Sequence, residues 1–352
     1  MSYHFVFGAS GSGKSTMLQK EMTRRAGEAL RARFASAAEG KTSLPRNYIF
    51  IVPEQYTLQT QKELVMASPF RGILNVDVLS FGRLTHRIFE ESGADRRAVL
   101  GDMGKTLILR RLAGTLKDKL PVIGAELSRE GYIAEVKSAL SEFMQYGISP
   151  KGLGELIRYA GADSGARHGA LEARLRDLET IYRAFLEYEQ QNFVTSEETL
   201  DLVAEAVPHS ALAAESVFVF DGFTGFTPVQ ARVIAQLMKY APEVWISLVF
   251  SDDGGSMPEE VFKTGSAGSG QDLFYLTRKT VRDLGALLAG QGELAGEDLY
   301  LQKPHRFADA PALAYLEKRL FRYPVIPYPG DEEPAAQFRG GSSPVCPSTG
   351  EE

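Results

Sequence analysis

The sequence predicts an α/β fold in which a parallel sheet is interrupted by a large helical insertion. Apolar runs of four to seven residues, bounded by glycine, proline or polar residues, alternate with helical patterns over residues 1–97. The alternation returns in residues 207–250, whereas residues 98–206 contain helical patterns and no strand-like run. Alternating strands and helices are typical of a parallel sheet with right-handed crossovers. We therefore expect one sheet that is built from both segments.

The predicted strands are short apolar runs with clear endings. The first, Tyr3–Phe7, runs directly into a glycine, as a buried parallel strand does. Pro53 stops the second strand, and Ser80 is an N-cap candidate for the helix that follows the third strand. The remaining predicted strands are Asn47–Val52, Val76–Leu79, Val217–Phe220 and Val244–Phe250.

Helical patterns fill the segments between these strands and most of the insertion. Within the insertion, apolar residues spaced three to four apart predict one buried helix face, and Thr195 with Glu198 forms a capping-box pattern that opens another helix. The predicted buried face consists of Leu171, Leu175, Leu178, Tyr182, Phe185 and Tyr188. Other predicted helices are Met17–Phe34, Glu54–Met66, Pro228–Tyr240, Asp272–Leu288 and Ala312–Phe321, with loops at Ala35–Arg46 and Ser251–Gly270.

Length and composition exclude several classes of protein. The chain of 352 residues is too long for one simple core and predicts two or more domains. A net charge of −6 argues against a surface that binds nucleic acid everywhere, although a local basic groove is compatible with it. The single cysteine, Cys346, excludes an internal disulfide and a cysteine-rich metal site within these residues. No apolar run has the length of a membrane span and the N-terminus lacks a signal-peptide pattern, so we expect a cytoplasmic protein.

The glycine-rich stretch after the first strand is typical of a phosphate-binding loop. Residues 8–15, GASGSGKS, fit the pattern G-x-x-x-x-G-K-[ST] between a predicted strand and a predicted helix. Glycines let the backbone turn its N–H groups toward an anion, and the helix adds the positive end of its dipole. The alternative, a glycine-rich turn with a chance lysine, does not explain the strand–loop–helix context.

This loop predicts a nucleoside triphosphate, ATP, and Mg²⁺ as ligands. Lys14 can reach the β- and γ-phosphates, and the hydroxyl of Ser15 can ligate Mg²⁺. The residues expected to bind the nucleotide are Gly8, Ala9, Ser10, Gly11, Ser12, Gly13, Lys14, Ser15 and Thr16.

Asp221 is the candidate for a second Mg²⁺ ligand. It follows the apolar run VFVF directly, at the carboxyl edge of the predicted sheet, where ligands of parallel sheets gather. Asp-Gly is also a common turn pair, so a turn aspartate is the competing interpretation. A hydrolase would need a neighbouring carboxylate to polarise the attacking water, and the neighbour here is Gly222. The sequence therefore argues for nucleotide binding without efficient turnover.

Basic and aromatic residues near the second and third strands are candidates for contacts with DNA. Three basic residues, Arg83 among them, follow the third strand, and Lys105–Lys119 contains five basic residues against one acidic. Tyr56 and Phe81 lie at strand-to-helix corners, where a base could stack. Solvated helix faces also explain the charges, and core packing also explains the aromatic residues.

In this order, the motifs resemble the AddB family, called RexB in some lineages, which is one of the two subunits of the bacterial AddAB helicase-nuclease. The resemblance runs from Tyr3 to about Tyr328 and rests on GASGSGKS, IVPEQYTLQTQKEL, VDVLSFGRLTHRIFE, the helical insertion and VFVFDGFTGFTPVQ. It implies a P-loop NTPase with a RecA-type parallel sheet and a superfamily 1 helicase layout. Residues 1–97 and 207–250 would form the P-loop domain, 98–206 the inserted helical subdomain, and 251–328 a linker and helices leading to a second helicase-like domain.

The resemblance also implies roles for individual residues. Lys14 and Ser15 correspond to helicase motif I, and Asp221 with Gln230 corresponds to motif II. Motifs Ia and Ib contact single-stranded DNA in helicases, and their positions here are Glu54, Gln55, Tyr56, Ser80, Phe81 and Arg83.

Motif II departs from the helicase pattern. UvrD-like helicases read DEFQDT, whereas Gly222, Thr224 and Gly225 replace the glutamate, glutamine and aspartate here. The catalytic carboxylate is missing, which argues against motor activity in this chain. The resemblance then implies that an AddA-type partner supplies the main motor.

The implied function is that of an ATP-binding, DNA-binding subunit that works with an AddA-type partner on double-strand DNA ends and single-stranded DNA for recombinational repair, away from membranes. The family continues into a nuclease domain with a 4Fe–4S cluster on four cysteines, so neither the nuclease nor the cluster is expected in this chain, which has one cysteine. Residues 329–352 are expected to be disordered or aberrant, which suggests a truncated or frameshifted reading.

Two other functions fit parts of the sequence. A P-loop small-molecule kinase also opens with GSGKST, although an insertion of about a hundred helical residues fits such an enzyme poorly. A non-enzymatic DNA-binding scaffold would keep the loop as a vestige. ATP titration of the chain and of a Lys14→Ala variant distinguishes these functions.

Overall fold

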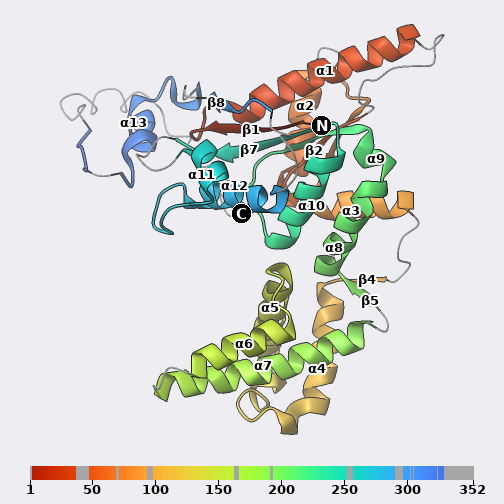
Figure 1. The fold of residues 1–352 in the computed structure, drawn as a ribbon, viewed down its shortest axis with the longest axis vertical. Coiled ribbons are helices and arrows are strands. Elements are labelled where there is room, and N and C mark those ends of the chain that lie inside the picture. The colour runs from red at the N-terminus through yellow and green to blue at the C-terminus, as the bar shows by residue number, and fades with distance from the viewer. Residues whose placement is uncertain are drawn as a thin grey trace, which may run out of the picture.

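The structure is a computed structural model, and it describes residues 2–36, 47–68, 71–92, 98–161, 166–190, 193–251, 257–289, 296–301, 303, 305–322 and 324–328. Its central sheet has six parallel strands in the order β3-β2-β6-β7-β1-β8 (Figure 1). The predicted parallel sheet is thus confirmed, and β8 is a strand that the sequence did not predict. The strands are β1 (Ser2–Gly8), β2 (Asn47–Ile51), β3 (Val76–Leu79), β6 (Ser216–Phe220), β7 (Glu243–Val249) and β8 (Leu299–Leu301).

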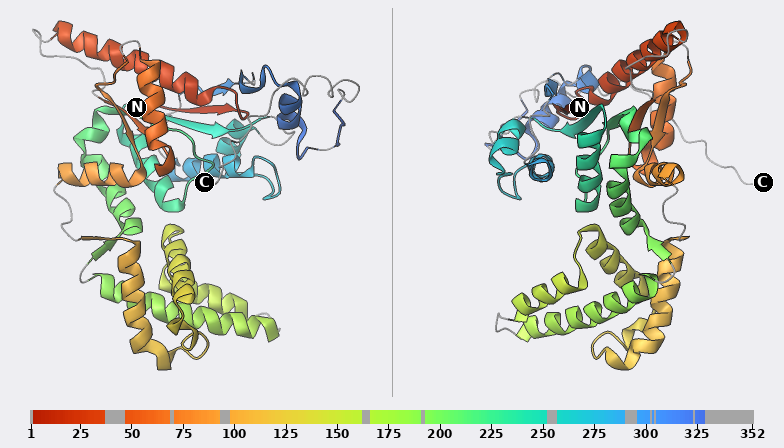
Figure 2. Two further views of the ribbon diagram at one scale, coloured as in Figure 1. Left: turned by 180° about the vertical axis from the view of Figure 1, so that it is seen from behind. Right: turned by 45° about the vertical axis from the view of Figure 1, so that its right-hand side comes forward.

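Helices cover both faces of the sheet (Figures 1 and 2). Phe5 and Phe218 point to one face, where they share a core with α3, α8, α10 and α12. Val6 and Val219 point to the other face, where they pack with α1 and α2. Burial on both faces explains why these strands are continuous apolar runs. The helices are α1 (Lys14–Ser36), α2 (Thr57–Ala67), α3 (Phe81–Ser92), α8 (Ser196–Ala206), α10 (Pro228–Tyr240) and α12 (Tyr275–Leu288).

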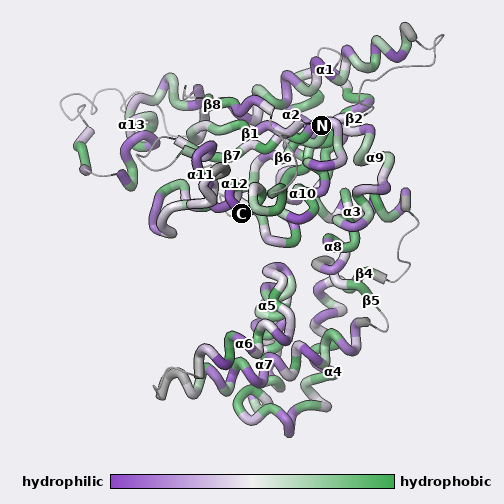
Figure 3. Tube along the Cα trace, viewed as in Figure 1, coloured by the Kyte–Doolittle hydropathy of each residue, from purple (hydrophilic) through white to green (hydrophobic). Residues whose placement is uncertain are grey.

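The insertion is a separate helical body that lies below the sheet domain in Figure 1. Its helices enclose a hydrophobic core of their own, which includes Tyr182 and Phe185 of the predicted buried face. Leu171 of that face is 49% exposed, because its turn lies outside this core, so the prediction is wrong at that residue. Figure 3 shows hydrophobic and hydrophilic residues alternating along these helices. They are α4 (Asp102–Leu116), α5 (Glu130–Gln145), α6 (Pro150–Gly161) and α7 (Ala166–Gln190).

Two short strands connect the insertion to the sheet domain. The chain enters through β4 (Ala98–Leu100) and returns through β5 (Phe193–Thr195), and the two strands pair in parallel. The prediction that residues 98–206 contain no strand is therefore wrong. Each strand has three residues, which is too short to show a period, and each is stabilised by its distant partner. The capping residue after β5 is confirmed, since the side chain of Thr195 accepts a hydrogen bond from the backbone N–H of Glu198 at 3.1 Å.

The C-terminal segments differ in part from the sequence prediction. Helix α11 (Pro258–Thr264) forms within Ser251–Gly270, which the sequence predicts as a loop. Its start has a proline in the first turn followed by two glutamates, a helix signal that the surrounding glycine and serine obscure. The other helices are α9 (Ala211–Ala214) and α13 (Pro311–Arg319). The predicted loop at 37–46 and the predicted disordered tail at 329–352 lie outside the described residues. In the described parts of the chain, no helix has both the length and the apolar character that crossing a membrane requires.

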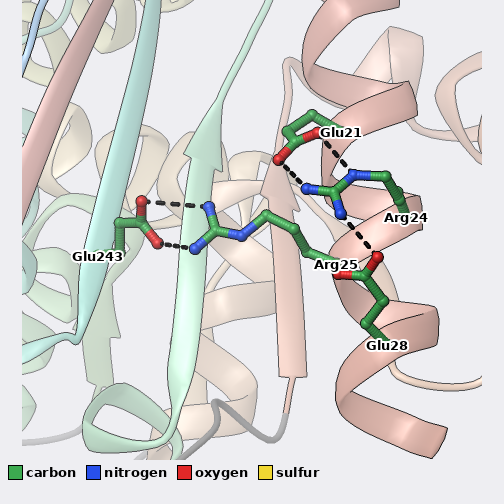
Figure 4. Close-up of polar contacts among 5 residues, drawn as sticks. All are labelled: Glu21, Arg24, Arg25, Glu28 and Glu243. Atoms are coloured by element: carbon green, nitrogen blue, oxygen red, sulfur yellow. Dashed lines mark hydrogen bonds and ion pairs between the residues drawn. The ribbon is translucent and has the colours of Figure 1, made fainter.

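A buried ion pair fastens α1 to the first residue of β7 (Figure 4). Arg25 donates hydrogen bonds to both carboxylate oxygens of Glu243, at 3.2 and 2.5 Å. His4 of β1 approaches the same carboxylate at 3.4 Å. Arg24, one residue earlier, pairs instead with exposed carboxylates of its own helix. The network therefore ties helix α1 to the two central strands that lead to the glycine-rich loop and the sheet edge.

Replacement of Glu243 by glutamine should destabilise the fold in a pH-dependent way. Burial alone would raise the pKa of Glu243, but hydrogen bonds from His4 and Arg25 outweigh burial and hold it at about 2, below the usual 4.5. The ionised carboxylate therefore stabilises the fold above pH 4.5, and this contribution is lost as the pH falls toward 2. We expect E243Q to lower the free energy of unfolding at pH 7 by about 2–3 kcal/mol.

Urea unfolding at several pH values measures this effect. Glu28→Gln is the matched control, because Glu28 pairs with Arg24 on the same helix but is 58% exposed. It should change the free energy of unfolding by less than about 1 kcal/mol. A loss in E243Q that is the same at pH 3 and pH 7 would contradict the charge argument.

Candidate functional site

A cavity of about 460 Å³ lies at the carboxyl ends of β1, β6 and β7. Parallel strands end at the same edge of a sheet, which brings together segments that are far apart in the sequence. The cavity is lined by residues 10–16, residues 221–224, Ser247, Val249, His305 and Arg306. The sequence-predicted loop and Asp221 thus line one cavity.

The loop between β1 and α1 is closely packed and depends on glycine. Gly11 and Gly13 have φ angles of +75° and +89°, in the region that side chains other than glycine rarely adopt. A Cβ atom on Gly8 would lie 2.5 Å from Oγ of Ser12 and 2.7 Å from the carbonyl oxygen of Leu301. The Oγ atom of Ser12 is itself buried and has no hydrogen-bond partner. The loop is therefore a fixed turn that leaves a buried hydroxyl unsatisfied.

Lys14 is buried at the start of α1, with 8% of its surface exposed. Its Nζ donates hydrogen bonds to the carbonyl oxygens of Gly8 at 2.7 Å and Ala9 at 3.0 Å. Burial lowers the pKa of Lys14, the negative charges of Asp221 and Glu317 oppose this, and Arg306 lowers it further. The ammonium group thus lies under the loop, within electrostatic reach of the second predicted site residue.

Asp221 follows β6 at the sheet edge and is 6% exposed. Its backbone N–H donates to the carbonyl oxygen of Ile51, which extends the strand pairing by one residue. Its Oδ1 atom is buried and has no hydrogen-bond partner. A buried carboxylate oxygen without a partner is unfavourable unless a cation or donor satisfies it. Gly222, the next residue, has a φ angle of +81°.

Two basic residues of the site were not predicted from the sequence. His305 and Arg306 belong to the short 3-10 helix His305–Phe307, which follows β8 and packs on the glycine-rich loop. The backbone N–H of Arg306 donates to the carbonyl oxygen of Gly11 at 3.0 Å, and a Cβ atom on Gly11 would lie 2.7 Å from Cβ of Arg306. The three-residue strand that positions this segment carries no periodic signal, so the sequence could not place it beside β1.

The predicted DNA-contact residues divide into exposed and buried groups. Tyr56 is 47% exposed, whereas Phe81 is 8% exposed and belongs to the sheet-domain core. Ser80 is buried and caps α3, accepting a hydrogen bond from the backbone N–H of Arg83 at 3.4 Å. The other exposed members of this set are Glu54, Gln55 and Arg83.

A second cavity, of about 880 Å³, lies beside these residues. It is lined by α3, α8 and the N-terminal turn of α10, with Gln145 from the end of α5 in the insertion. Gln230, in that turn, forms a capping box with Thr227 and thus stabilises the start of α10. We refer to this cavity as the α3–α8–α10 groove. Among the described residues, no group of three histidine, cysteine, aspartate or glutamate side chains is arranged to hold a metal ion.

Comparison with known proteins identifies the family. Residues 5–317 match the family model described as ADDB, N-terminal. The chain belongs to the AddB N-terminal family. The match confirms the family resemblance of the sequence motifs, and it includes the glycine-rich loop, the insertion, Asp221 and Arg306.

Curated relatives agree with the AddB assignment. A protein from Lachnoclostridium phytofermentans is 34% identical over 338 residues, which are 95% of this chain and 27% of the relative. Relatives from Symbiobacterium thermophilum and Moorella thermoacetica are 32% and 31% identical, over 94% of this chain in each case and 26% and 27% of the relatives. The name of all three describes one subunit of an ATP-dependent helicase/deoxyribonuclease, the same subunit in each case. The chain spans about a quarter of the length of these relatives.

Proposed function

We propose that this chain is the ATP-binding and DNA-binding N-terminal part of a helicase-nuclease subunit that acts in the cytoplasm on double-strand DNA ends during recombinational repair. The observation that carries the proposal is that the glycine-rich loop and Asp221 line one cavity in a chain of the AddB family. The names of the relatives support the helicase-nuclease context. The proposed fold is that of a P-loop NTPase with a RecA-type sheet, in which residues 98–206 are the inserted helical subdomain of a superfamily 1 helicase.

The residues of the cavity fit a triphosphate with Mg²⁺. Ser15 and Asp221 would hold the metal ion, and the unpartnered Oδ1 of Asp221 supports this role. Lys14 would exchange the carbonyl oxygens of Gly8 and Ala9 for phosphate oxygens, which accept stronger, charge-assisted hydrogen bonds. Bound Mg²⁺–ATP would supply the negative charge that this buried cationic site lacks.

Arg306 supports the same ligand. Its positive charge acts on Lys14, so two cations approach the loop from different segments of the chain. A site with two converging cations is suited to an anion that carries several charges, as a triphosphate does. The absence of a carboxylate at Gly222 argues for binding without efficient hydrolysis, so an AddA-type partner would supply the motor of the proposed heterodimer.

The exposed residues around Tyr56 are the proposed contacts for single-stranded DNA. Stacking of a base on an aromatic ring is worth about 1–3 kcal/mol, and Tyr56 presents an exposed ring next to Arg83 and the α3–α8–α10 groove. We expect Tyr56→Ala to weaken the binding of a single-stranded oligonucleotide about tenfold. Fluorescence anisotropy with a labelled oligothymidine at two salt concentrations measures this loss.

Tyr159→Ala is the matched control for Tyr56→Ala. Tyr159 is 83% exposed, but it lies on α6 in the insertion, away from the groove. It should leave the affinity unchanged, and the affinity of the unmodified chain should fall as salt rises. Equal losses in both variants, or an affinity that salt does not change, would contradict a DNA-binding surface at Tyr56.

Two competing functions give different outcomes. A small-molecule kinase would transfer the γ-phosphoryl group to a metabolite, and membership of the AddB family gives no support for that activity. A DNA-binding scaffold with a vestigial loop would bind the oligonucleotide but would not bind ATP, with or without Lys14. Isothermal titration of the chain with Mg²⁺–ATP separates the scaffold from the proposed function.

A further inference from the structure

The junction between the insertion and the sheet domain contains buried ionisable groups. The chain crosses this junction twice, through the paired strands β4 and β5. Around them, Lys105 of α4 is 2% exposed, Glu189 at the end of α7 is 1% exposed, and Thr195 of β5 is 1% exposed. Charged side chains are rarely buried this far unless they serve a purpose.

Thr195 joins the two helices that meet at the junction. Its backbone N–H and its side chain both form hydrogen bonds with the carboxyl group of Glu189, at the end of α7. Its Oγ1 also accepts the hydrogen bond from the backbone N–H of Glu198, in the first turn of α8. One residue thus connects the last helix of the insertion to the first helix that returns to the sheet domain.

The two glutamates make this connection sensitive to protonation. Oε1 of Glu189 and Oε2 of Glu198 are buried and have no hydrogen-bond partners. Burial raises the pKa of Glu189 to about 7, the charge of Glu198 acts in the same direction, and Thr195 and Lys105 oppose it. Lys105 on α4 and Glu198 on α8 are the charged groups that act on Glu189, while Ser141 of α5, which accepts from Lys105 at 3.4 Å, is neutral.

We propose that this junction is a proton-controlled hinge between the insertion and the sheet domain. With Glu189 protonated, one negative charge is absent from the buried site and the insertion is held firmly. With Glu189 and Glu198 both ionised, two buried like charges repel each other and the junction loosens. Because the folded state binds this proton more tightly than the unfolded state, the docked arrangement is most stable below pH 4.5 and weakens as the pH rises through 7.

The hinge has a structural consequence at the α3–α8–α10 groove. Helix α8 begins one residue after Thr195, and Thr199 and Leu200 in its first turns line the groove. Gln145 of the insertion lines the same groove. A loosened junction would therefore change the separation between Gln145 and the groove walls that α3 and α10 provide.

Energy transfer between two dyes tests the hinge. The dyes, chosen for emission that does not change with pH, are placed at Lys62→Cys on α2 and Lys151→Cys on α6, which are exposed positions, in a Cys346→Ser background. We expect the transfer efficiency of the otherwise unmodified chain to change between pH 5.5 and 8.5 with a midpoint near 7. Glu189→Gln should remove the transition and keep the low-pH value throughout, and Glu198→Gln should move the midpoint to lower pH.

Glu172→Gln is the matched control, because Glu172 lies on the same helix α7 but pairs with Arg176 at the surface. It should leave the midpoint unchanged. Circular dichroism at each pH verifies that every variant is folded before its transfer efficiency is interpreted. A constant efficiency in the labelled chain, or a transition that survives in E189Q, would overturn the proposal.

Discussion

The Lys14→Ala substitution should weaken the binding of Mg²⁺–ATP about 10- to 100-fold. Lys14 is buried under the glycine-rich loop, and its Nζ already makes two hydrogen bonds to loop carbonyl oxygens that phosphate oxygens would replace. A hydrogen bond to a charged group contributes about 1.5–3 kcal/mol, and each 1.4 kcal/mol corresponds to about tenfold in affinity. Isothermal titration of both proteins with ATP, with and without Mg²⁺, measures the difference.

Two further variants make the Lys14 experiment specific. Lys20→Ala removes an exposed lysine from the same helix and should leave ATP affinity unchanged. Asp221→Asn keeps the shape of the side chain but removes its charge, so it should abolish most of the gain in affinity that Mg²⁺ gives. Equal and negligible affinity in the unmodified chain and in K14A would defeat the nucleotide proposal and favour the DNA-binding scaffold.

The sequence predicted the sheet and the glycine-rich loop well because their signals are local. Tyr3–Phe7, GASGSGKS and the following helix are adjacent in the chain, and Asp221 directly follows an apolar run. The parallel sheet then brings the loop and Asp221 to one edge without further information. This part of the candidate site could be derived before the structure was known.

The features that the sequence did not predict depend on distant contacts. The strands β4, β5 and β8 have three residues each, and each is stabilised by a partner far away in the sequence. Arg306 lies at the loop only because β8 pairs with β1. Tyr56 and Phe81 are both aromatic residues at strand-to-helix corners, yet only tertiary packing decides that the first is exposed and the second is buried.

Gly222→Glu, which adds the carboxylate found in the helicase pattern, should destabilise the chain and should not create ATP hydrolysis. Gly222 has a φ angle of +81°, and a residue with a side chain in this left-handed region costs about 1–2 kcal/mol. The space itself is sufficient, since a Cβ atom would lie 3.5 Å from Cδ of Pro53, an ordinary contact. The expected loss of about 1–2 kcal/mol therefore comes from the backbone.

Urea unfolding and a phosphate-release assay of two alanine variants separate backbone strain from the added charge. Gly222→Ala should lose as much stability as G222E, because both place a Cβ atom at the same positive φ angle. Gly101→Ala should lose none, since Gly101 has a φ angle of −76° and open space around it. If G222E were as stable as the unmodified chain and hydrolysed ATP faster, the missing carboxylate would be the only barrier to turnover. The positive φ angle argues instead that the backbone after Asp221 is itself adapted to binding without hydrolysis, so a single substitution cannot restore a motor.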